Sequence, residues 1–592
     1  MNRTDMFVNK HKQTLCVIRI VLISVFFASA MGSIHMAGKS AAEMNAAYIL
    51  FFLFASALLR SEEKLSPDRH IRLCSGVFAA LYSAALLAGE AVNRDNSTAS
   101  LFSSPLRGLL SVLYFTCLFL VCRSAAALIL QWLSGWAGRG NVSDGKGFTK
   151  AFFLRWAVTF FFWMPAMLAY YPGIMAYDTR YQTYMASTGL ANYTKLHPPL
   201  HTWIWGLFLK LREATGIEAS TSYGIVQALL LSAILAWAVG EVFGARRRAD
   251  ALVTLFFACN PVFAVMAINP TKDVCFAMAF TAFFVLLRRL VLNGWRFRGK
   301  KDGFLFSLSI LLSCLFRNNA PYVFLVFLVF CLIIRKVQSV RPGVLAAILL
   351  PLILFYGIND GLYPAIGIAE GNTREMLSVP MMQIARVSLE EREHLTEEEC
   401  EQIDTYLDPE VLPSRYNPRF ADGTKFLFSE EAFQASGKQF VKLWLSLMVK
   451  YPGDYLDAWL SLHLPYWYPN AAPVDPVANR RYVETVVMNN DYCSFIRPEK
   501  FPRLLQFYEK AASCELFRDV PVAAGLFSLQ APLWLLAFCI CAAAARRRYV
   551  LIMLYMPSLL LWLTYILGPV SNFRYVFPLF LLFPFYLEAV SH

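Results

Sequence analysis

The sequence predicts an all-α polytopic membrane protein with about 14 transmembrane helices. Hydrophobic residues make up 57% of the 592 residues and charged residues only 16%, whereas soluble proteins carry roughly 25% charged residues. Apolar runs near 20 residues long recur between short charged clusters, which is the pattern of helices that cross a bilayer. The strand-like alternation of a membrane β-barrel does not occur in the sequence.

The basic clusters predict how these spans are oriented. Lys and Arg are enriched in cytoplasmic loops, so the clusters at 246–248 and 546–548 are expected on the inside. Residues 361–522 hold 24 acidic against 16 basic residues and are expected to form a mainly helical external domain. The net charge of +13 therefore reflects membrane topology, and no nucleic-acid partner is expected. The first apolar run is expected to stay as an uncleaved helix.

The chain divides into four regions under this topology. The N-terminal transmembrane region is 1–150, the core is 151–360 with a first external loop at 172–221, the external domain is 361–522, and the C-terminal helices occupy 523–592. The expected spans are 15–34, 43–60, 73–90, 108–134, 152–171, 222–244, 250–268, 274–293, 303–316, 320–334, 342–360, 523–545, 549–568 and 575–591. Arg123 lies within one of them, and an intramembrane arginine is expected to find a partner inside the bundle.

Two apolar segments are not expected to span. Residues 198–211 read as a helix that is too short to cross, so it should lie in the outer interface with Trp203 and Trp205 at headgroup depth. In the external domain, the aromatic run 466–468 either stacks on a sugar or belongs to an interfacial belt. Helices are expected at 390–407 and 430–460 of that domain.

Polar residues gather where the spans end on the outside, which is where Lys and Arg should be scarce. Taken singly, each reads as an interfacial anchor or part of a local ion pair. Four cations near one or two acids instead suit a lipid-linked phosphate, and Asp178 is placed to act as a general base. The candidate catalytic residue is Asp178, and the candidate substrate-binding residues are Arg180, His197, Lys272, Asp273, Arg317, Asn318 and Arg574.

An outward span ends in YDTRYQ, and HPPLHTWIWGLF follows about twenty residues later. This first external loop resembles that of the GT-C membrane glycosyltransferases. The superfamily includes protein O-mannosyltransferases, aminoarabinose transferases of lipid A and oligosaccharyltransferases, and the arrangement also occurs in bacterial membrane families of GT-C type. The resemblance implies that Asp178 is catalytic. Many members have two adjacent acids where this chain has Asp178-Thr179, and Asp273 is the candidate for the second acid.

The resemblance implies an inverting transferase in the bacterial cytoplasmic membrane, with its active site on the extracytoplasmic face. The expected donor is a sugar on polyprenyl phosphate, and the acceptor is a glycan, lipid or protein of the cell envelope; membrane lipids surround both. No ligand spacing requires a metal, and no CxxC occurs; a divalent metal stays open. The alternatives are a transporter or flippase of lipid-linked sugars, an envelope polysaccharide polymerase or ligase, and a non-catalytic assembly factor.

Overall fold

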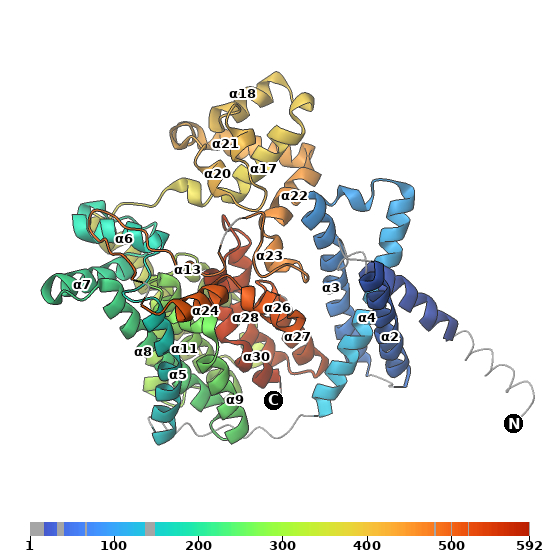
Figure 1. Ribbon diagram of the computed structural model, residues 1–592, viewed down its shortest axis with the longest axis horizontal. Helices are drawn as coiled ribbons and strands as arrows, with labels where there is room; N and C mark the ends of the chain where they lie inside the picture. Colours follow the sequence, from blue (N-terminus) through green and yellow to red (C-terminus); the bar gives the residue numbers. More distant parts are fainter. Residues whose placement is uncertain are drawn as a thin grey trace, which may run out of the picture.

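The computed structural model describes residues 17–31, 41–64, 68–135, 149–478, 481–498, 500–518 and 520–590. This part of the chain is all-helical and contains isolated β-bridges but no strand. The helices form a bundle with a helical lobe at one end and the N-terminal helices along one side (Figure 1). The predicted all-α class is confirmed.

Seven of the described helices are long and apolar enough to cross a membrane. They are α3 (Arg69–Asp95), α4 (Pro105–Gly135), α5 (Lys150–Ala169), α8 (Ala219–Phe243), α11 (Lys272–Leu292), α15 (Pro342–Tyr356) together with α16 (Tyr363–Ala365), and α29 (Phe573–Leu581) together with α30 (Phe583–Val590). Shorter apolar helices are Val17–Met31, α13 (Ala320–Ile333), α27 (Ala531–Ala545) and α28 (Tyr549–Tyr565). These helices support the membrane character, while the total of 14 spans stays a prediction.

The expected span 250–268 is bent. It consists of α9 (Arg247–Ala258) and α10 (Pro261–Ile268), which meet at 60°. Pro261 has no N–H to continue the helix, and the Asn260 side chain accepts hydrogen bonds from the backbone N–H groups of Val262 and Phe263 at 3.0 and 3.3 Å. Asn260 thus caps a new helix. The two helices together are long and apolar enough for the expected span, and the Asn-Pro pair gives it a bend that was not predicted, because it both stops α9 and starts α10.

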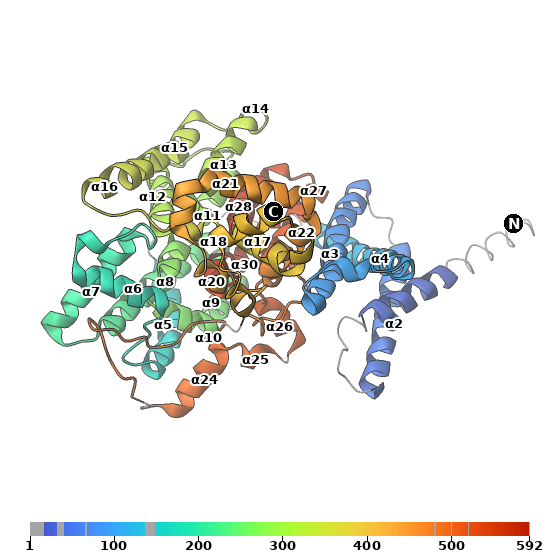
Figure 2. The same ribbon diagram turned by 90° about the horizontal axis from the view of Figure 1, so that it is seen from above.

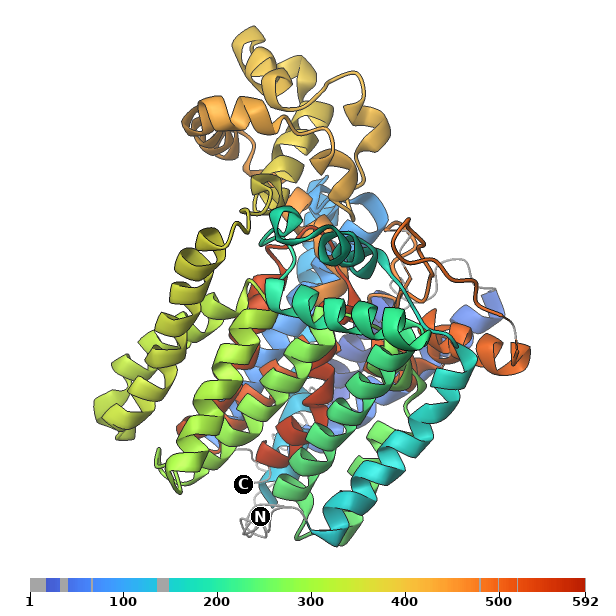
Figure 3. The same ribbon diagram turned by 90° about the vertical axis from the view of Figure 1, so that its left-hand side faces the viewer.

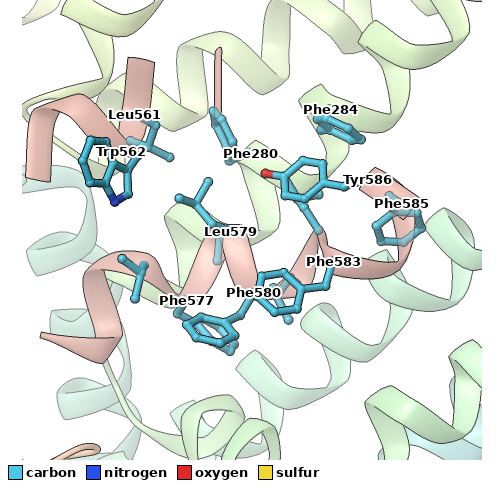
Figure 4. Packing of buried hydrophobic residues seen from close by; sticks show 14 of the residues in the cluster. Phe280, Phe284, Leu561, Trp562, Phe577, Leu579, Phe580, Phe583, Phe585 and Tyr586 are labelled. Carbon is cyan, nitrogen blue, oxygen red and sulfur yellow. The ribbon is translucent and has the colours of Figure 1, made fainter. Parts of the chain in front are cut away.

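Helix α11 lies at the centre of the bundle and is buried along most of its length. It packs against α8, α12 (Lys300–Phe316) and α29. Aromatic rings fill the contact: Phe284 of α11 meets Tyr586 edge to face at 5.3 Å between ring centroids (Figure 4). The last two helices of the chain therefore occupy the interior of the bundle.

The two ends of α11 carry different groups. At its C-terminal end, Arg288 donates to Glu588 at 2.7 and 2.8 Å, and Arg246 donates to the same carboxylate at 2.9 Å. The 21 residues of α11 span about 32 Å at 1.5 Å per residue. The basic loops are thus separated from the N-terminal end of α11 by about the thickness of a bilayer core.

The N-terminal helices α2 (Ala41–Lys64), α3 and α4 stand beside the bundle with the helix Val17–Met31 (Figure 2). Buried residues such as Phe27, Leu59 and Leu118 give them a small core of their own. Arg123 was expected to find a partner inside the bundle, and the structure shows that this partner is Glu62 on α2, at 3.2 Å.

The helical lobe comprises α17 (Ser378–Glu390), α18 (Glu397–Tyr406), α21 (Glu430–Lys450) and α22 (Pro452–Leu462), which share a separate apolar core above the bundle (Figures 1 and 3). The expected helix 390–407 starts late, because Thr396 and Glu399 form a capping box. The expected helix 430–460 is interrupted before Pro452, where proline removes a backbone donor.

Two arginines hold the lobe to α3. Arg386 donates to the carbonyl of Asn96 at 2.9 Å, and Arg419 donates to the carbonyl of Val92 at 3.0 Å. Both carbonyls lie at the C-terminal end of α3, where the Val92 carbonyl also accepts from the N–H of the cap residue Asn96 at 2.9 Å. This end of a helix carries negative partial charge, which favours arginine. Arg386 is therefore part of this junction.

The remaining described helices are short or connect the larger ones. They are η1 (Ala99–Leu101), α6 (Tyr177–Thr188), η2 (Leu190–Asn192), α7 (Pro199–Thr215), α14 (Arg335–Gln338), η3 (Gly357–Leu362), η4 (Thr373–Glu375), η5 (Arg392–His394), α19 (Leu412–Arg415), α20 (Asp422–Lys425), α23 (Leu464–Trp467), α24 (Pro502–Ala512), α25 (Glu515–Arg518) and α26 (Pro521–Phe527).

Two aromatic predictions need correction. Helix α7 lies across the ends of the long helices (Figure 3). Its Trp205 is fully buried and donates to the hydroxyl of Thr183 at 2.9 Å. Trp205 is a packing residue, not a headgroup anchor. Tyr466, Trp467 and Tyr468 are also buried in the bundle core, so they form neither an exposed sugar platform nor an interfacial belt.

Candidate functional site

One carboxylate oxygen lies at the centre of the candidate site. Oδ2 of Asp178 is 2.8 Å from Nη1 of Arg574, 3.1 Å from Nζ of Lys272 and 3.9 Å from Nδ1 of His197. These residues come from α6, α29, α11 and the loop before α7, so four separate segments meet here. The structure therefore brings together residues up to 396 positions apart in the chain.

The helix starts that present these side chains are capped by polar residues. The Thr271 hydroxyl accepts from the backbone N–H of Asp273 at 3.3 Å and starts α11. The Asn572 side chain accepts from the backbone N–H of Arg574 at 3.2 Å and starts α29. Such caps fix where a helix begins, and the N-terminal end of a helix carries positive partial charge. Both helices therefore add to the positive potential of Lys272 and Arg574.

A second ion pair lies beside the first and is more deeply buried. Asp273 is 1% exposed, receives Arg317 at 2.8 Å and accepts from the Thr271 hydroxyl at 3.1 Å. The guanidinium of Arg317 also lies over the rings of Tyr575, Tyr565 and Phe276, at 4.7, 5.1 and 5.5 Å from their centroids. Arg317 is thus enclosed by protein partners on several sides.

Arg574 connects the two pairs. Its Nη1 contacts Asp178 at 2.8 Å, and its Nε lies 3.7 Å from Oδ2 of Asp273. That distance is too long for a hydrogen bond. A shift of Arg574 would therefore affect both carboxylates.

Electrostatics hold Asp178 ionised and His197 neutral. Burial by itself would raise the pKa of Asp178, but Arg574, Lys272 and His197 together with the Arg574 hydrogen bond hold that pKa well below its ordinary value. Burial, followed by the charge of Lys272, lowers the pKa of His197 to about 3. Nδ1 of the neutral imidazole accepts a hydrogen bond from Nζ of Lys272 at 2.9 Å.

A cavity of about 180 Å³ opens against this cluster. Its wall includes Asp178 and Arg574, the turn before α11, the cap Asn572, and the segment 482–484 that follows the buried aromatic run. Two buried polar atoms at this wall, Nε of Arg574 and Oδ1 of Asn269, have no hydrogen-bond partner in the described part of the chain. The wall also carries the carboxylates of Asp422 and Glu484. The unpaired N–H of Arg574 is therefore the group of this wall that suits an anion, whereas the carboxylates and the Asn269 oxygen suit hydroxyl donors.

Two predicted residues lie outside the cluster. Arg180 is exposed, and in the ranges that the structure describes its guanidinium forms no hydrogen bond or ion pair. Asn318 donates to the carbonyl of Lys195 at 2.9 Å, so it supports the loop that leads to His197. The other predicted residues, Asp178, His197, Lys272, Asp273, Arg317 and Arg574, lie together.

Sequence reasoning missed the residues that position the cluster. Tyr466 donates its hydroxyl to the carbonyl of Asn572 at 3.1 Å and accepts from the N–H of Asn572 at 2.8 Å. Thr271 and Asn572 each follow an apolar run and precede the next one, which is the cap signal that would have identified them. Tyr466 gives no such signal, because its contact spans 106 positions.

His201 has a packing role. It is fully buried and lies 3.0 Å from the amide oxygen of Gln182 and 2.8 Å from the hydroxyl of Tyr223. These contacts join α7 to α6 and α8. Across the described residues, His, Cys, Asp and Glu side chains form no group of three that could hold a metal ion.

A protein-family model described as a family of unknown function, DUF6020, matches residues 109–592. No curated protein matches the chain, and no solved structure does.

Proposed function

We propose that the chain, which belongs to DUF6020, a family of unknown function, is a membrane glycosyltransferase. It transfers a sugar from a polyprenyl-phosphate donor to a hydroxyl of a cell-envelope acceptor, on the extracytoplasmic face, with a GT-C-like arrangement of about 14 spans. The observation that carries the proposal is the convergence of Lys272 and Arg574 on the carboxylate of Asp178, beside a cavity that Asp178 and Arg574 line at the ends of the apolar helices.

The chemistry divides between the carboxylate and the cations. Asp178 accepts the proton of the acceptor hydroxyl, whose oxygen forms a bond to the anomeric carbon from the face opposite the donor phosphate. The bond between that carbon and the phosphate oxygen breaks, and its electron pair leaves with the lipid phosphate. Lys272 and Arg574 stabilise the charge that develops there. Asp273 and Arg317 hold Arg574 and the start of α11 in place.

Transfer of a labelled sugar tests this function. Purified protein in lipid nanodiscs is incubated with radiolabelled polyprenyl-phosphate sugars and an envelope extract, and the label in acceptor is measured for wild type and Asp178→Asn. The variant should transfer about 10²–10⁴-fold more slowly, which is the usual contribution of a general base. Asp491→Asn is a control in a loop outside the cluster. Wild-type transfer by Asp178→Asn removes the proposed role of Asp178. Carriage of lipid-linked sugar across the membrane without transfer favours a transporter instead.

The proposed sidedness has its own test. Single cysteines are placed next to Asn319 and Asn572 near the site, and next to Arg247 and Arg298 at the basic ends, in a background without accessible native cysteines. The first two should react with an impermeant maleimide applied to whole cells, and the last two only after permeabilisation, because basic loops stay inside. The reverse pattern would place the site in the cytoplasm.

A further inference from the structure

Asp178 accepts hydrogen bonds from the same N–H groups that an anionic ligand would need. Its Oδ2 receives both Arg574 and Lys272, at 2.8 and 3.1 Å. These distances are close to those by which Arg and Lys bind a phosphate oxygen. A phosphate oxygen and the Asp178 carboxylate therefore compete for the same N–H groups.

The neighbouring pair differs in how firmly it is held. Arg317 is fixed by Asp273, by Asn319 at 3.0 Å and by three aromatic rings. No aromatic ring encloses the ammonium of Lys272 in the described part of the chain, and its second contact is a neutral imidazole at 2.9 Å. The guanidinium of Arg574 lies over one ring, that of Tyr575 at 5.1 Å, and its side chain is 26% exposed, against 10% for Arg317. Lys272 and Arg574 are therefore the cations that are able to exchange one anion for another.

Resting on the proposed function, we infer that the Asp178 carboxylate is an internal substitute for the phosphate of the donor. The phosphate enters the adjoining cavity, takes over Lys272 and Arg574, and releases the carboxylate. Asp178 is then free to accept a proton from the acceptor hydroxyl. Because the carboxylate is engaged by two cations until the phosphate arrives, binding of the donor and activation of the base occur together.

This coupling has a chemical advantage. A carboxylate held by two cations is a weak base, and the charges that hold down the pKa of Asp178 are those of Arg574 and Lys272. When Arg574 and Lys272 bind the phosphate instead, they no longer offset the effect of burial, and the pKa of Asp178 rises. The base gains strength only while the donor is in place.

Anion binding by a variant in which the Asp178 carboxylate is replaced with a neutral amide tests the inference. Wild type and Asp178→Asn are purified in nanodiscs, and the dissociation constants of decyl phosphate, inorganic phosphate and decanol are measured by calorimetry. Asp178→Asn should bind decyl phosphate at least about tenfold more tightly than wild type, the scale of one charged hydrogen bond. Tighter binding of inorganic phosphate to the same extent would assign the site to the phosphate group, and tighter binding of decyl phosphate alone would assign it to a lipid phosphate.

Asp422→Asn is the matched control. Asp422 lines the same cavity, and its carboxylate is 2.8 Å from Lys425. Its neutralisation removes the same charge from the wall while the contacts of Asp178 with Lys272 and Arg574 stay in place, so it measures the general effect of charge on anion binding. An equal gain in affinity from Asp422→Asn and Asp178→Asn would overturn the inference.

The remaining outcomes separate the inference from the proposed function. If wild type and Asp178→Asn bind decyl phosphate equally and Lys272→Ala abolishes binding, the phosphate site stands and the inference falls. If neither binds decyl phosphate better than decanol, both fall. Asp178→Ser is the second variant if Asp178→Asn does not fold. Folding of these variants only with added phosphate supports the inference, because the anion then replaces the carboxylate; folding that phosphate does not rescue contradicts it.

Discussion

Removal of the Tyr466 hydroxyl should disturb the site from a distance. Tyr466 is fully buried, and its hydroxyl bonds to both backbone groups of Asn572, which caps α29 next to Arg574. In Tyr466→Phe the carbonyl of Asn572 keeps the N–H of Tyr575 at 3.3 Å, whereas the N–H of Asn572 loses its acceptor.

The expected loss of stability follows from that single N–H. A buried donor without a partner costs about 1–3 kcal/mol. At about 2.1 cal/mol/K of unfolding entropy per residue, a cooperative chain of this size would melt roughly 1–2.5 °C lower. Thermal unfolding followed by tryptophan fluorescence measures the shift, and calorimetry with decyl phosphate measures the accompanying loss of anion affinity.

Tyr565→Phe is the matched control for this prediction. Tyr565 is 2% exposed, its ring centroid lies 6.0 Å from that of Tyr466, and its hydroxyl forms no hydrogen bond in the part of the chain that the structure describes. Loss of this hydroxyl should leave the melting temperature and the affinity unchanged or slightly raised. Equal behaviour of the two variants would refute the reasoning that Tyr466 positions α29.

Three further predictions concern single side chains. Lys272→Ala and Arg574→Ala should each weaken binding of decyl phosphate about tenfold or more, whereas Arg180→Ala, at an exposed position, should change it little. Calorimetry measures the three affinities, and equal losses would show that Arg180 belongs to the site. Arg317→Lys keeps the charge but loses the planar stacking on three rings, so its melting temperature should fall while decyl phosphate still binds. His197 has a pKa of about 3 in the folded protein against an ordinary 6.5. Between these values the unfolded chain binds more protons than the folded protein, so the free energy of unfolding falls as the pH falls from 6.5 towards 3. His197→Gln should reduce the slope of unfolding free energy against pH by up to about 1.4 kcal/mol per pH unit, and an unchanged slope in thermal melts would contradict the assignment.

Composition was sufficient to predict the class of fold. The apolar runs at 222–244 and 274–293 became α8 and α11 with shifts of a few residues, because a helix of that length is fixed by the hydrophobic pattern alone. The bend between α9 and α10 was not predicted, since a local Asn-Pro signal outweighed the periodicity. The aromatic run 466–468 was misplaced because burial against a distant helix cannot be derived from the run itself.

The residues of the candidate site could be predicted from the sequence, but the contacts between their side chains could not. Charged residues at the ends of apolar runs are rare enough that Asp178, Lys272 and Arg574 could be singled out as a set, although each alone reads as an anchor or an ion pair. Which cation meets which acid could not be derived from the residue pattern, since that depends on how the helices pack. Arg180 has the same composition signal as Arg574, and only the direction of its side chain on α6 separates it from the cluster.

The position of the last two helices bears on how the protein is made. The interior of the bundle is filled by residues 573–590, which are synthesised last among the described residues. Until they leave the ribosome, Asp178 has no Arg574, and Arg246 and Arg288 have no Glu588. The earlier helices therefore cannot complete the packing of the bundle interior before residues 573–590 are made. A chain that stops short of residue 572 would lack both Arg574 and Glu588, and would therefore leave Asp178, Arg246 and Arg288 without these partners.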